Sequence, residues 1–170
     1  MIRLSRTPRT PRPDVELQRG EKLLAWAEGT DGTVVAGSQD ALHLLAGPAV
    51  RRIPWEQVEA ASWDAAAGSL RVSEVGTWGE ERPEHVVALD EPGRVLELVR
   101  ERVTASIVLQ RHVDLGGRRG MRVIARRAPR GAAKVFWVFE YDEGVDASDP
   151  AVVTAAREAL EDAKRDVGLD

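Results

Sequence analysis

Arginine side chains are concentrated between residues 111 and 134, and they are the residues of this chain best suited to bind a ligand. This segment holds eight arginines and lysines against one aspartate, a net charge of +7, whereas segment 135–170 has a net charge of −7. Guanidinium groups bind phosphates and carboxylates through paired hydrogen bonds. The candidate anion-binding residues are Arg118, Arg119, Arg122, Arg126, Arg127 and Arg130. The alternative is that this basic segment pairs with the acidic segment that follows it, or with a partner protein.

An external anion would meet these arginines along a β-ribbon. Arg122 and Arg126 alternate with apolar residues and point to one side of an expected strand, with Ile124 between them. Such a ribbon contacts phosphates without reading a nucleotide sequence. The chain as a whole is acidic, with a pI near 5.5, and the basic strand lacks aromatic residues for base stacking. Binding of nucleic acid or an anionic membrane surface is therefore the second function hypothesis.

The sequence offers few candidate residues for catalysis or metal binding. The chain has no cysteine, which excludes disulfides, thiolate metal sites and cysteine nucleophiles. His43, His85 and His112 fall in three separate expected strands without the spacing of a metal site. There is no G-x-S-x-G elbow, no P-loop and no pair of carboxylates with a catalytic signature. The sequence therefore predicts a non-enzymatic protein with no catalytic residue, no metal and no cofactor.

Tryptophan is the commonest aromatic residue, with five copies against two phenylalanines and one tyrosine. Trp26, Trp55 and Trp63 lie in apolar stretches and are expected in the core. Trp78 lies in the polar loop Gly76–Pro83. An exposed loop tryptophan can anchor a partner protein, and the alternative is that it covers the end of the core. Trp78 is the candidate partner-binding residue.

Short apolar runs divide the first half of the chain. Seven of them lie between residues 22 and 89, separated by glycine-rich and proline-containing turns at a spacing of about ten residues, which is typical of an antiparallel sandwich or barrel. The period then changes. An expected helix has Asp90 as its N-cap and Pro92 in its first turn, and its apolar face is formed by Val95, Leu96, Leu98, Val99 and Val103.

Three local motifs carry a resemblance to a known family. They are Gly20–Leu24 (GEKLL), Ala41–Leu45 (ALHLL) and Arg52–Val58 (RIPWEQV). Together with the order of elements, they resemble bacterial pleckstrin-homology-like (GRAM-like) domains over residues 18–104. The resemblance implies a seven-stranded bent barrel whose open end is capped by the helix. It also implies that a partner binds on an exposed strand edge.

A different unit is expected after this helix. Ile107–Val113, Gly120–Arg127 and Lys134–Tyr141 are typical of three antiparallel strands in a meander, and a C-terminal helix is expected to begin at Ser148–Pro150. The whole chain is then an α+β protein. Because three strands and one helix make a small core, we expect residues 105–170 to pack on the first domain or on a partner chain.

Residues 1–17 form an expected flexible arm rich in arginine, threonine and proline. No apolar run approaches the roughly 20 residues that span a bilayer, and no hydrophobic stretch follows Met1–Arg6, so we expect a cytoplasmic protein.

The first function hypothesis is a protein-interaction or assembly module that binds a protein partner or itself. The third hypothesis is a small enzyme or ligand carrier with a pocket at the mouth of the barrel.

Overall fold

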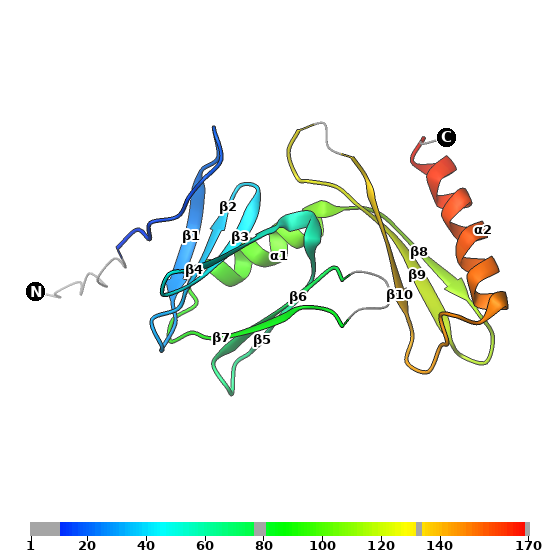
Figure 1. Ribbon diagram of the computed structural model, residues 1–170, viewed down its shortest axis with the longest axis horizontal. Coiled ribbons are helices and arrows are strands. Elements are labelled where there is room, and N and C mark those ends of the chain that lie inside the picture. The colour runs from blue at the N-terminus through cyan, green and yellow to red at the C-terminus, as the bar shows by residue number, and fades with distance from the viewer. Residues whose placement is uncertain (1–10, 77–80, 132–133, 169–170) are drawn as a thin grey trace, which may run out of the picture.

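A computed structural model describes residues 11–76, 81–131 and 134–168 of this protein. Its first unit contains a four-stranded antiparallel sheet in the order β1-β2-β3-β4 and a three-stranded antiparallel sheet in the order β5-β6-β7, with helix α1 beside both (Figure 1). The strands are β1 (Leu23–Glu28), β2 (Val34–Ser38), β3 (Ala41–Ala46), β4 (Ala49–Pro54), β5 (Val58–Asp64), β6 (Ser69–Glu74) and β7 (Glu84–Ala88). Helix α1 spans Val95–Ser106, and a short 3-10 turn, Trp55–Gln57, joins β4 to β5.

The second unit is a three-stranded antiparallel sheet covered on one face by a helix (Figure 1). Its elements are β8 (Ile107–Asp114), β9 (Gly120–Arg126), β10 (Phe136–Tyr141) and α2 (Pro150–Asp166). Helix α2 begins where the sequence predicts, because the Asp149 side chain accepts a hydrogen bond from the Ala151 N–H and Pro150 fits the first turn. Small side chains on α2, at Ala156, Ala159 and Ala163, let it pack closely on β9.

The predicted α+β class is confirmed, with ten strands in three antiparallel sheets and two helices in the described ranges. The predicted barrel is not confirmed. The seven strands of the first unit form two sheets, neither of which closes, and an isolated bridge between Gly29 and Leu89 links the ends of β1 and β7. At the other junction, the 3-10 turn carries the chain from one sheet to the other.

Trp55 is the centre of the core of the first unit. Its side chain is fully buried, and its indole Nε1–H donates a hydrogen bond of 3.1 Å to the Ser38 carbonyl. Gly37 allows α1 to approach β2, since a Cβ atom at this position would collide with the Leu98 side chain. The position of α1 is therefore set by a glycine on the sheet and by the tryptophan beneath it.

A buried polar cluster lies at one edge of this core. The Glu21 carboxylate accepts a hydrogen bond from the Ser38 hydroxyl, and its Oε1 lies 3.4 Å from Nη2 of Arg52 and 3.9 Å from Nε2 of His43. Burial opposes ionisation of Glu21, yet the hydrogen bonds from Ser38 and the Gln18 N–H hold its pKa below the ordinary value. Burial also lowers the pKa of His43, which is therefore neutral in the folded protein at pH 7.

This cluster makes stability depend on pH. His43 has a lower pKa in the folded chain than its ordinary 6.5, so below that pH the unfolded chain takes up the proton more readily and the free energy of unfolding falls. We expect urea unfolding at about pH 7 and about pH 5 to show this loss for the wild-type chain. His43→Gln is expected to reduce the difference between the two pH values. An equal difference in both proteins would contradict this assignment.

Candidate functional site

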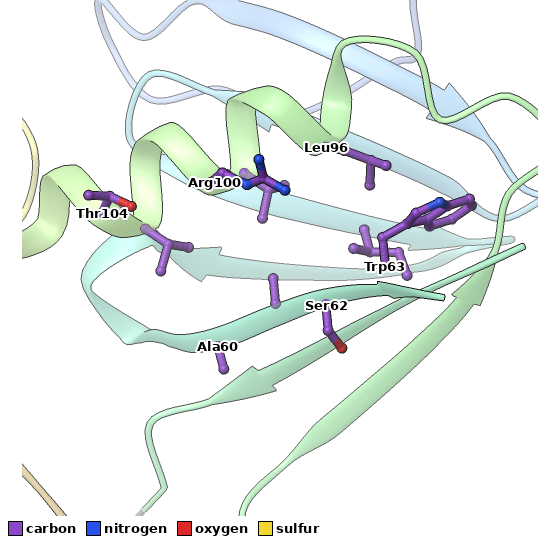
Figure 2. A pocket seen from close by; sticks show the side chains of 10 residues that line it. Ala60, Ser62, Trp63, Leu96, Arg100 and Thr104 are labelled. Atoms are coloured by element: carbon purple, nitrogen blue, oxygen red, sulfur yellow. The ribbon is translucent and has the colours of Figure 1, made fainter. Parts of the chain in front are cut away.

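Strand β5 has a free edge. Among the described strands it pairs only with β6. Ala61 lies opposite Val72 and Trp63 lies opposite Leu70, both of which are buried, so Ala61 and Trp63 share the inner face of the sheet. Ala60 and Ser62 point to the other side (Figure 2). Ala61 therefore lies on the inner face of the sheet but is exposed, because no other element covers it fully.

A groove of about 350 Å³ separates β5 from α1. Leu96, Val99 and Val103 of the helix line one wall, and Trp63 lies near Leu96 at one end (Figure 2). Arg100 and Thr104 are exposed on the helical rim. The small side chain of Ala61, on the inner face of β5, leaves this space open. Its volume lies at the lower end of the range for sites that take a ligand or a few side chains.

Arg126 of β9 closes one end of the β5 edge. Its side chain is 2% exposed. Nη1 donates to the Val58 carbonyl at 2.9 Å and to the Ser106 hydroxyl at 3.0 Å, and Nη2 donates to the Glu59 carbonyl at 2.8 Å. This one guanidinium therefore joins the second unit to β5 and to the end of α1. The part of the β5 edge that remains open begins at Ala60.

The charges around Arg126 hold it in place. Burial lowers the pKa of its guanidinium, and the nearby carboxylates of Glu140 and Glu59 oppose that shift, so the group remains a cation. Burial raises the pKa of Glu59, against the effect of an ion pair with Arg82 at 2.5 Å. Arg126 and the carboxylates of Glu59 and Glu140 lie close together where β9 of the second unit meets β5 of the first.

The structure corrects one of the predicted anion-binding residues and places three others in internal contacts. Arg126 is buried and its donors are used by carbonyl and hydroxyl oxygens, which removes it from the surface set. Arg122 pairs with Glu140 at 3.0 Å, Arg119 donates to the Gly144 carbonyl at 2.9 Å, and Arg130 forms two hydrogen bonds with Asp40. Much of the basic segment therefore pairs within the chain.

Two of the exposed predicted arginines remain outside these internal contacts. Within the described ranges Arg118 and Arg127 make no ion pair. Arg118 lies in the turn before β9, with a positive φ of 67°, and Arg127 follows the end of that strand. A seven-residue strand separates them by about 20 Å, so the structure does not bring them together. The predicted partner-binding residue Trp78 lies outside the described residues.

The helical period places Leu96 on the apolar face and Arg100 on the opposite face, but it does not by itself place a groove between this helix and Ala61 of β5. A signal for the groove exists in the helix, where Leu96 and Val103 lie to one side of the buried stripe of Val95, Leu98 and Val99. A helix with apolar residues beyond its buried stripe has a second apolar contact to fill.

The described residues contain no group of three or more His, Asp or Glu side chains placed to hold a metal ion. Among the described helices, none has the length and apolar character needed to cross a membrane. A scan against models of protein families and searches of curated proteins and of solved structures each find no match to this chain.

Proposed function

We propose that this protein is a non-enzymatic interaction module whose first unit, a pleckstrin-homology-like domain, binds an extended segment of a partner protein along β5. The observation that carries the proposal is the open edge of β5 beside an apolar groove of about 350 Å³. The sequence of four strands, three strands and a helix supports the family assignment, as do the motifs at Gly20–Leu24 and Arg52–Val58.

Backbone hydrogen bonds provide the main binding interaction. A strand presents the backbone groups of alternate residues to the same edge. Arg126 binds the outward carbonyl of Glu59, so the groups of Ala61 and Trp63 follow on that edge and are available to an added strand. This is the mode of β-augmentation, in which backbone bonds give affinity and pockets for alternate side chains give selectivity.

Side-chain selectivity comes from the groove. Leu70 and Val99 form an apolar floor, and Trp63 and Leu96 close one end, so an apolar side chain of the added segment fits between β5 and α1. Arg100 on the rim is exposed and makes no ion pair with a described residue. A carboxylate near that apolar residue would pair with it. The expected ligand is therefore an extended segment with an apolar residue flanked by an acid.

Ala61→Leu separates binding from folding. The added side chain occupies the groove and buries apolar surface, so the free energy of unfolding is expected to rise by about 1 kcal/mol. Peptide binding is expected to be lost because the same space is no longer open. Ser62→Leu is the matched control, since Ser62 also borders the groove but its side chain points away from α1 (Figure 2).

The experiment uses a displayed library of random peptides selected on the immobilised wild-type protein. Selected peptides are then titrated against wild type, Ala61→Leu and Ser62→Leu by isothermal calorimetry. The proposal expects binding to wild type and Ser62→Leu, and at least about a tenfold loss of affinity for Ala61→Leu. Equal affinity for the two variants would contradict it, as would a library that yields no binding peptide.

A further inference from the structure

Strand β10 is an unprotected sheet edge. The three-stranded sheet has the order β10-β9-β8, so one side of β10 has no partner among the described strands. Its sequence, FWVFEY, contains four aromatic residues and one charge, and its pairing with β9 has no bulge. That charge, Glu140, is paired with Arg122 on β9. Natural edge strands usually carry lysine, proline or a bulge that prevents pairing with another chain, and β10 has none of these.

Helix α2 leaves this edge incompletely covered. It packs mainly over β8 and β9, so the β10 side chains on the same face, Trp137, Phe139 and Tyr141, are only partly buried. The rings of Phe139 and Tyr141 stack with centroids 6.5 Å apart. On the other face Phe136 is 44% exposed. Apolar side chains therefore flank the free backbone edge on both faces of the sheet.

The free backbone groups can be identified. The Asp142 N–H donates to the Gly120 carbonyl at 3.0 Å. Because the backbone groups of alternate residues point to the same side, Phe136, Val138 and Glu140 direct theirs to β9. Trp137 and Phe139 direct theirs to the open edge, where no described strand pairs with them.

The charged residues at the two ends of β10 indicate which chain would pair with it. Lys134 lies just before β10, and Asp142 and Glu143 lie just after it. An antiparallel copy of the same strand brings the basic end of each β10 next to the acidic end of the other. A twofold axis at Val138 places Lys134 opposite Asp142 of the second copy and Trp137 opposite Phe139 of the second copy. Opposed residues in an antiparallel pair share a face, so this register keeps aromatic side chains together.

We propose that β10 pairs with β10 of a second copy of this chain in an antiparallel, twofold-symmetric arrangement. The two three-stranded sheets then form one continuous six-stranded sheet with an α2 helix from each copy. The interface is isologous and closes on itself, which ends the assembly at a dimer. This inference goes beyond the proposed peptide binding and does not depend on it. If both hold, the dimer presents two β5 grooves to a partner.

A pair of variants at Phe136 tests both the interface and its register. In the proposed arrangement Phe136 lies opposite Glu140 of the second copy. Phe136→Glu places like charges opposite each other at two symmetric positions, and Phe136→Lys places opposite charges there. Since Phe136 is exposed, both variants are expected to fold, which circular dichroism and a cooperative thermal transition would verify.

The measurement is sedimentation equilibrium of the full chain. The wild type is expected to show twice the 18.6 kDa of one chain. Phe136→Glu is expected to weaken the dimer by at least about tenfold relative to Phe136→Lys. A wild-type chain that remains monomeric at a concentration of about 100 μM would overturn the proposal. Equal dissociation constants for the two variants would also overturn it, because the charge opposite residue 136 would then not matter.

Discussion

Replacing Arg126 with methionine is expected to lower the free energy of unfolding by about 3 kcal/mol. Methionine occupies a similar volume, but the carbonyls of Val58 and Glu59 and the hydroxyl of Ser106 lose their shared donor. Each buried polar group left without a partner costs about 1 kcal/mol or more. Urea unfolding followed by tryptophan fluorescence measures this change.

Arg122→Met is the control for this prediction. Arg122 lies on the same strand and also points away from α2, but it is exposed and its contact is an ion pair with Glu140. Exposed ion pairs contribute less than about 1 kcal/mol. We therefore expect a small change for Arg122→Met. Equal losses in the two variants would show that Arg126 does not join the two units as described.

Trp55→Ala is the second substitution with a large expected effect, a loss of about 3–5 kcal/mol in the free energy of unfolding. The side chain is fully buried and fills the space below α1, where Gly37 and Leu98 meet. No neighbouring element can move in without losing its own contacts, so a cavity remains. Trp55→Phe keeps most of the volume and loses the hydrogen bond to the Ser38 carbonyl, with an expected cost of about 1–2 kcal/mol.

Chemical denaturation at a single pH compares these variants with Trp63→Ala. Trp63 is only partly buried at the end of the groove, so its removal is expected to cost less than that of Trp55. A larger loss at Trp63 than at Trp55 would contradict the description of the core. It would also mean that Trp63 lies in the core and not at the end of an open groove.

Periodicity in the sequence is sufficient to predict most elements of this fold. The alternation through Met121–Arg127 correctly separates Met121 and Val123, which pack under α2, from Arg122 and Arg126. The same pattern does not distinguish the two arginines from each other. Arg126 is buried only because β5, nearly 70 residues earlier in the chain, packs beside it. A contact between distant segments is not encoded in local spacing.

The groove shows a similar limit. The strand that ends at Trp63 is predictable from its apolar run, and the helix from its period. Which strand lies at the edge of a sheet depends on pairing between segments, and Ala60–Ser62 look ordinary in isolation. Trp63 is expected in the core, whereas it lies partly buried beside α1. The strand and the helix of the candidate site can therefore be predicted from the sequence, but the groove between them is seen only in the structure.

The most direct test of the account is backbone amide NMR of the labelled protein, titrated with a peptide selected on it. We expect the largest chemical-shift changes at Ala61 and Trp63 of β5 and at Leu96 and Arg100 of α1, with cross-strand contacts between the peptide backbone and β5. Changes confined to another surface, such as the cleft between β4 and β7 that contains Val50 and Val86, would contradict it.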